Sequence, residues 1–126
     1  MRVAVIGAGY VGLVQAVGLA SLGHYVAVGE RNPERVGALL AGKAPFAEPG
    51  LEELLVAAHD RLAISDDNHA AVRDAEVVFI AVPTPEGPDG SADLSIVDAV
   101  VDEVTPSLRP ASVLALKSTV PIGTID

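Results

Sequence analysis

The 126-residue sequence contains no cysteine, and only 3% of its residues are aromatic. The missing thiols exclude disulfides, thiolate metal sites and a cysteine nucleophile within these residues. Basic residues are also scarce, because 8 Lys and Arg stand against 17 Asp and Glu, a formal net charge of −9. So acidic a surface repels phosphodiester backbones and anionic headgroups. We therefore expect neither a nucleic-acid nor a membrane partner.

Long hydrophobic runs are missing too. No run approaches the roughly 18 apolar residues of a membrane span, and Gly7 interrupts the N-terminal run of residues 1–6 before it could form a signal peptide. We therefore expect a cytoplasmic protein. Hydrophobic residues nevertheless make up 50% of the chain, so its core must be built from Val, Leu, Ile and Ala. The length fits one domain, residues 1–126.

Short apolar runs alternate with helical patterns along the whole chain. Strands are predicted at residues 3–6, 25–28, 61–65, 76–82 and 112–116, and helices at 11–22, 33–40, 51–58, 68–73 and after residue 92. Gly23 is placed to end the first helix, Asn32 to cap the second and Asp93 to cap the last. Repeated β-α units predict an α/β fold: a doubly wound (Rossmann) parallel sheet with helices on both faces, incomplete at the C-terminus.

The faces of two helices can be predicted from their apolar positions. The first helix is expected to bury Val14, Val17 and Leu22. The last helix is expected to bury a stripe that contains Leu94, Val97, Val101, Val104 and Leu108. Asp102 and Glu103 lie off this stripe, so both are expected at the surface.

A glycine-rich hexapeptide, residues 7–12, directly follows the first predicted strand and opens a helix. Gly7 permits the tight turn, Gly9 lets a pyrophosphate approach the backbone, and Gly12 lets the helix pack closely on the strand. The amides and the positive dipole end of the helix then face the phosphates. This Gly-x-Gly-x-x-Gly in its strand–helix context predicts dinucleotide binding.

Glu30 ends the second predicted strand, where a carboxylate can accept hydrogen bonds from the adenosine ribose hydroxyls. The same carboxylate repels a 2′-phosphate, which favours NAD over NADP. The neighbouring Arg31 works against this preference, since a guanidinium beside the ribose could accommodate that phosphate.

Further segments are not required by a generic dinucleotide fold. They are residues 48–55 (EPGLEELL), 81–85 (AVPTP), 89–95 (DGSADLS) and 117–124 (KSTVPIGT). In this order after GAGYVGL, they resemble the UDP-glucose/GDP-mannose dehydrogenase family over nearly the whole chain. Members oxidise the primary alcohol of a sugar nucleotide to a carboxylate with two NAD. The resemblance implies the N-terminal part of a longer, homodimeric enzyme, whose thiol nucleophile lies beyond Asp126.

The resemblance also implies roles for particular residues. Tyr10 and Val11 would line the pyrophosphate loop, Glu30 would bind ribose, and Arg35 would approach the adenosine. Thr84 would contact the cofactor, and Thr119 would lie near the nicotinamide and help to position the catalytic water. The chain departs from the family at Glu30, where Asp is more common, and at Pro83, where a small residue is more common.

Topology independently groups three of these segments. Loops at residues 7–12, 82–85 and 118–121 follow the first, fourth and fifth strands, so all three open on one edge of a parallel sheet. Two rival functions remain: a hydroxyacid or hydroxyacyl-CoA dehydrogenase domain, and a non-catalytic NAD-binding regulatory module.

Several polar residues are better explained by structure. His24, His59 and His69 show no metal-ligand spacing, so we expect no metal site. The acidic pairs at residues 52–53 and 66–67 fit helix starts or solvent. Lys117 is equally compatible with a phosphate or substrate contact and with a structural ion pair.

Overall fold

The computed structural model describes residues 1–44, 49–82 and 95–116. Five strands and five α-helices lie in these ranges, close to the predicted positions. The strands are β1 (Arg2–Ile6), β2 (Tyr25–Gly29), β3 (Leu62–Ser65), β4 (Val77–Ile80) and β5 (Val113–Leu116). The helices are α1 (Tyr10–Ser21), α2 (Pro33–Leu40), α3 (Leu51–Ala57), α4 (Asn68–Val72) and α5 (Ser95–Val104).

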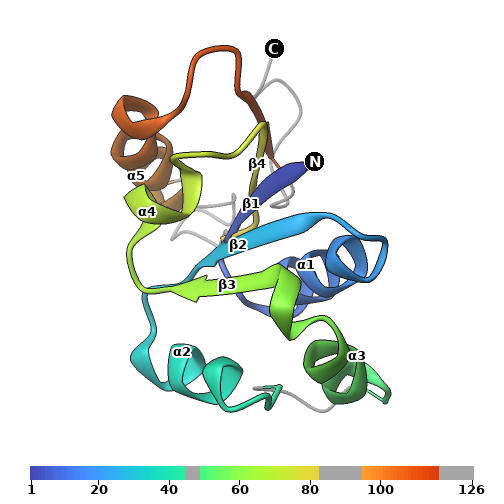
Figure 1. Cartoon of the computed structure of the whole chain (residues 1–126). Coiled ribbons are helices and arrows are strands. Elements are labelled where there is room, and N and C mark those ends of the chain that lie inside the picture. Colours follow the sequence, from blue (N-terminus) through green and yellow to red (C-terminus); the bar gives the residue numbers. More distant parts are fainter. Residues whose placement is uncertain (45–48, 83–94, 117–126) are drawn as a thin grey trace.

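The strands form one parallel sheet in the order β3-β2-β1-β4-β5 (Figure 1). This confirms the predicted doubly wound fold. The order reverses between β1 and β4, where Ile6 pairs with Ile80. Ile80 in turn pairs with Leu116, so β1, β4 and β5 end at the same edge. Ligands of such sheets bind beyond this carboxyl edge at the point of reversal.

Helices cover both faces of the sheet and enclose two aliphatic cores (Figure 1). Val3 and Val5 of β1 face the layer of α1, α2 and α3. Ala4 and Ile6 alternate with them and face the layer of α4 and α5. Because successive side chains of a strand point to opposite faces, the unbroken apolar run of β1 is explained by burial on both sides.

The predicted face of α1 was wrong at two positions. Val17 is buried, but Val14 is 38% exposed and Leu22 is 78% exposed. The helix instead buries Gly12, Leu13, Ala16, Val17 and Ala20, a stripe in which three of the five residues are glycine or alanine. Small side chains on the buried face let the helix approach the sheet closely.

The predicted stripe of α5 is largely confirmed. Val97 and Val104 are buried, while Val101 and Leu108 pack partly buried against the same core. Val100 is also buried and was not in the predicted stripe. Leu94 and the predicted cap Asp93 lie outside the described residues.

The predicted helix ends are confirmed where they can be compared. Asn32 caps α2, because its Oδ1 accepts hydrogen bonds from the N–H groups of Glu34 (3.0 Å) and Arg35 (3.4 Å). Gly23 follows α1 at φ +102, a left-handed conformation that glycine adopts readily. Ala111 has φ 67 just before β5 and lacks that freedom.

Candidate dinucleotide site

A cavity of about 540 Å³ opens at the carboxyl edge of the sheet, where the strand order reverses. The segments at the ends of β1, β2 and β4 supply part of its wall, and residues of α2, α4 and α5 supply the rest. Its lining includes Gly7, Glu30, Arg31, Arg35, Asn68 and Val82. The topology therefore places a sizeable hollow where the sequence predicted a ligand, and it brings Gly7, Glu30 and Arg35 together there.

The three glycines of the loop have different surroundings. Gly7 turns at φ +101, and a Cβ there would lie 2.8 Å from the carbonyl oxygen of Ala81. A Cβ on Gly12 would collide with the carbonyl oxygen of Gly7. Both glycines are thus required by the fold, since the nearest atom that each Cβ would meet is a backbone carbonyl oxygen. Gly9 differs, because a Cβ there would meet no atom of the described residues within 4 Å.

Gly9 is the residue that caps α1. Its φ of −72 and ψ of −170 are ordinary for any residue, and no side chain caps the helix. The first N–H groups of a helix lack partners within it and carry its positive dipole end. Tyr10 and Val11 form the first turn and are each 53% exposed. The described residues therefore leave room for an anion in front of this turn.

Glu30 is only 8% exposed, and three donors hold its carboxylate. Oε1 accepts hydrogen bonds from the N–H of Ala8 at 3.0 Å and from Nη1 of Arg35 at 3.3 Å. Oε2 accepts one from the N–H of Asn32 at 3.2 Å. The bond to Ala8 ties the carboxylate directly to the glycine-rich loop, so these two predicted elements form one rigid unit.

An ionised carboxylate offers about four lone-pair positions. The three donors to Glu30 occupy two positions on Oε1 and one on Oε2. Among the described contacts, Oε2 thus retains capacity for one further donor. Arg35 is 42% exposed in its side chain and forms an ion pair with Glu30, which sets it beside the same cavity.

Glu103 was predicted at the surface, and its side chain is 23% exposed but makes two contacts there. Its Oε2 forms an ion pair with Arg31, and its Oε1 accepts a hydrogen bond from Nδ2 of Asn68 at 2.8 Å. Asn68 is 4% exposed and lines the cavity. The sequence carried little signal for this contact, because the interacting residues are 72 and 35 positions apart. Asp102 is exposed, as predicted.

Asn68 was overlooked as a site residue. The signal that could have identified it is its position just past the carboxyl end of β3, at the edge where the other site residues lie. Its Oδ1 is buried without a hydrogen-bond partner among the described residues. A Cβ on Gly29 would collide with this oxygen, so glycine at the end of β2 lets α4 approach closely.

The other sequence-derived candidates behave as structural residues where they are described. Nδ1 of His59 lies 3.0 Å from the carbonyl oxygen of Val56, and Nδ1 of His69 lies 2.7 Å from Oγ of Ser107. Glu52 accepts a hydrogen bond from the N–H of Ala44 at 3.1 Å. Thr84, Lys117 and Thr119, with Pro83 and the loops at 83–85 and 118–121, lie outside the described residues.

Within residues 1–44, 49–82 and 95–116, no three His, Cys, Asp or Glu side chains are grouped as a metal site would require. None of the helices in these ranges is both long and apolar enough to cross a membrane.

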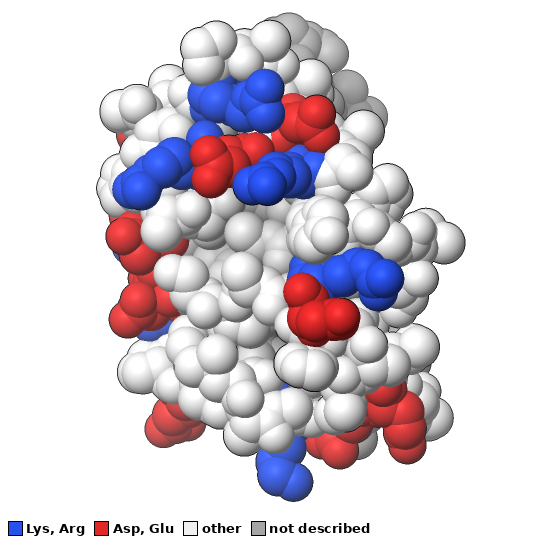
Figure 2. Space-filling view, viewed as in Figure 1, with Lys and Arg blue, Asp and Glu red and all other residues white. Residues whose placement is uncertain are grey.

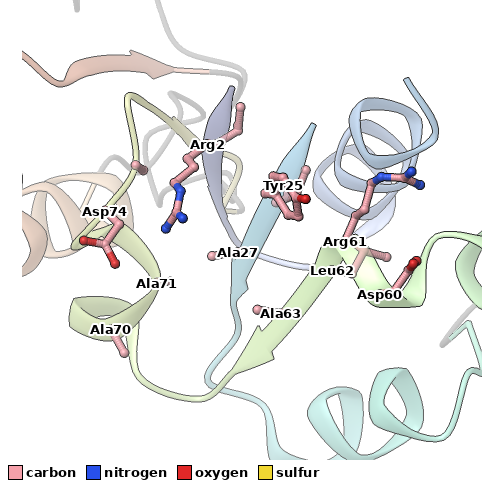
Figure 3. A pocket seen from close by; sticks show the side chains of 13 residues that line it. Arg2, Tyr25, Ala27, Asp60, Arg61, Leu62, Ala63, Ala70, Ala71 and Asp74 are labelled. Carbon is pink, nitrogen blue, oxygen red and sulfur yellow. The ribbon is translucent and has the colours of Figure 1, made fainter. Parts of the chain in front are cut away.

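A second hollow, of about 290 Å³, lies at the opposite, amino-terminal edge of β1, β2 and β3. Figure 2 shows a largely uncharged area on this face, bordered by groups of basic and acidic side chains. In Figure 3, Ala27, Ala63 and Ala71 line the hollow, with Asp74 to one side and Arg61 to the other. Ligands of parallel α/β sheets bind at the carboxyl edge, so the 540 Å³ cavity is the candidate site.

Comparison with known proteins agrees with this geometry. Residues 1–126 match the model of the UDP-glucose/GDP-mannose dehydrogenase family, NAD binding domain. The chain is 51% identical to a UDP-glucose 6-dehydrogenase of Pseudomonas aeruginosa, over 100% of this chain and 28% of that protein.

Two solved structures extend the comparison. A UDP-glucose dehydrogenase from Pyrobaculum islandicum has a TM-score of 0.92 at 44% identity, covering 98% of this chain and 30% of that one. A ternary complex of the GDP-mannose dehydrogenase of P. aeruginosa also has a TM-score of 0.92, at 36% identity, covering 99% of this chain and 30% of that one. The chain thus spans under a third of the length of these relatives. It belongs to the UDP-glucose/GDP-mannose dehydrogenase family and corresponds to the NAD-binding domain of that family.

Proposed function

We propose that the cavity at the carboxyl edge holds the adenosine half of NAD and that the loop of Gly7, Gly9 and Gly12 holds its pyrophosphate. The N–H groups in the first turn of α1, from Tyr10 and Val11, would donate to phosphate oxygens. Glu30 would accept a hydrogen bond from a ribose hydroxyl through Oε2. Its Oε1 is already committed to Ala8 and Arg35.

The observation that carries this proposal is the empty space around Gly9. Neither its backbone angles nor its described neighbours require glycine, since φ is −72 and a Cβ would lie more than 4 Å from every atom in residues 1–44, 49–82 and 95–116 that could clash with it. A residue without a side chain at the start of a 12-residue helix is explained if a ligand fills that space. A pyrophosphate fits the chemistry, because the helix start provides N–H donors and positive potential without any Lys or Arg.

Arg35 would contribute at the adenosine end. Its guanidinium lies at the cavity wall, and its Nη1 donates to Oε1 of Glu30 at 3.3 Å. The planar guanidinium can therefore stack on or border a purine, and it also orients the Glu30 carboxylate. Thr84 and Thr119 are proposed, from family resemblance alone, to contact the nicotinamide half, with Thr119 helping to position the catalytic water. Both follow strands that end at this edge.

We further propose that the complete protein is a nucleotide-sugar 6-dehydrogenase acting on UDP-glucose or a relative. Oxidation of a primary alcohol to a carboxylate removes four electrons, and two NAD accept them as two hydrides. Water supplies the second carboxylate oxygen. Covalent capture of the intermediate aldehyde needs a thiol, and these 126 residues contain none, so the nucleophile must be supplied from outside them. The domain described here would bind and orient NAD. A cytoplasmic homodimer is part of the proposal, and analytical ultracentrifugation of the complete protein tests the dimer.

Calorimetric titration with NAD tests the site assignment. Glu30→Ala should weaken NAD binding by roughly 1–3 kcal/mol, the scale for losing a charged hydrogen-bond partner. Glu34→Ala is the matched control, because Glu34 is an exposed acid on the same segment and only its backbone N–H makes a described hydrogen bond. Unchanged NAD affinity in the Glu30 variant would contradict the assignment, provided that its melting curve shows a folded protein.

A further inference from the structure

Glu103 connects three elements around the mouth of the proposed adenosine cavity. It extends from α5 to Arg31, which follows β2, and to Asn68, which begins α4. Figure 1 shows α4 and α5 side by side on one face of the sheet. Arg31 lines the cavity and is 64% exposed in its side chain, and Glu103, 23% exposed, pairs with it from outside the lining residues.

The position of Arg31 makes this pair relevant to cofactor choice. Arg31 directly follows Glu30 and lines the cavity, where a guanidinium could accept the 2′-phosphate of NADP. Its side chain instead pairs with the carboxylate of Glu103 on α5. A second negative charge therefore stands near the place that a 2′-phosphate would occupy, in addition to Glu30.

The carboxylate of Glu103 is held from its other side as well. Asn68 is 4% exposed and donates Nδ2 to Oε1 of Glu103 at 2.8 Å, so its orientation is fixed by burial. An exposed ion pair alone contributes little, about 0–1 kcal/mol, because two long side chains must be ordered. A carboxylate already oriented by a buried amide loses less freedom when it engages a guanidinium.

We propose that Glu103 is a specificity-determining residue that makes this pocket prefer NAD to NADP by holding Arg31 on α5. It acts through Arg31 and through its own charge. The inference rests on the proposed function, because it takes the cavity as the adenosine site. A purely structural role, fastening α5 to the end of β2, would change stability but not the choice between the two cofactors.

The test is the ratio of the NADP and NAD dissociation constants, measured by titration of the chain. Glu103→Gln is nearly isosteric and can still accept from Asn68, but it removes the charge that holds Arg31. It should raise NADP affinity about tenfold, the scale for one partly screened unit charge near contact, and leave NAD affinity within about twofold. Asp102→Asn, at the exposed neighbour on α5, should leave the ratio unchanged.

A double-mutant cycle isolates the mechanism. In an Arg31→Ala background, Glu103→Gln should keep only the part of its effect that comes from its own charge, because no guanidinium remains to be released, so the two substitutions should not be additive. Glu103→Asp withdraws the carboxylate by one methylene and should give an intermediate ratio, which provides a second variant if the first is poorly folded. An unchanged ratio in folded Glu103→Gln that binds NAD normally would overturn the inference. Failure of the site assignment looks different, since Glu30→Ala would then leave NAD binding intact.

Discussion

Replacing Gly9 by valine separates binding from folding. The new Cβ meets nothing within 4 Å in the part of the chain that the structure describes, and φ −72 with ψ −170 is a conformation that valine adopts freely. Valine is a poor helix cap, which costs about 1 kcal/mol, but it also restricts the unfolded chain, which offsets part of that cost. The free energy of unfolding should therefore change by less than about 1 kcal/mol.

Binding should respond quite differently. A branched side chain at residue 9 fills the space that the pyrophosphate would enter and forces it away from the N–H groups of α1. We expect a loss of at least about 2 kcal/mol in NAD affinity, since overpacking and lost hydrogen bonds add.

Gly12→Ala is the complementary variant, because it should lower the stability of the fold, which Gly9→Val should leave nearly unchanged. Its Cβ would collide with the carbonyl oxygen of Gly7, a backbone atom fixed in the turn, so the variant should lose about 3 kcal/mol or more of stability. Urea titration followed by circular dichroism measures stability, and calorimetry measures NAD binding. Wild-type NAD affinity in Gly9→Val would refute the phosphate-loop assignment. Wild-type stability in Gly12→Ala would refute the packing argument.

Two further predictions concern strain and catalysis. Ala111→Gly should stabilise the fold by about 0.5–1 kcal/mol, because a φ of 67 strains alanine. The control Ala41→Gly should not stabilise it, because Ala41 has a φ of −86. The midpoints of urea unfolding of the two variants test this prediction. The 126-residue chain mixed with NAD and UDP-glucose or GDP-mannose should form no sugar carboxylate, because it lacks the thiol that captures the aldehyde for the second oxidation. Detection of the carboxylate by mass spectrometry, with two NADH formed per sugar, would refute the thiol mechanism.

The sequence predicted the elements well where side-chain pattern and local chemistry agree. Residues 3–6 of β1 are all valine, alanine or isoleucine because both faces of the strand are buried there. Asn32 followed by Pro33 locates the start of α2 by a hydrogen bond between near neighbours. The glycine loop and Glu30 could be assigned to one site because the parallel topology brings the ends of β1 and β2 together.

The sequence was less informative where a helix is apolar on both its buried and its exposed side, and where two residues in contact are far apart in the sequence. α1 is apolar on most sides, so the exposed Val11 and Val14, and Leu22 just after the helix, obscured the buried alanines. Glu103 lies off the apolar stripe of α5, and a helical pattern cannot show that a distant arginine reaches it. Arg31 and Glu103 come into contact only when the chain folds.

The strand order also has a consequence for how the chain folds. Val3 pairs with Val26 in β2, the next strand along the chain, and also with Val77 in β4. The segment between Val3 and Val77 is much longer, because it contains both β2 and β3. Closing the longer loop costs more entropy, so we expect β1, β2 and β3 to assemble before β4 joins them. In pulsed hydrogen exchange during refolding, β4 amides should then gain protection after those of β2. Because α5 follows β4 in the chain, the cavity wall that carries Glu103 would be completed only at that late step.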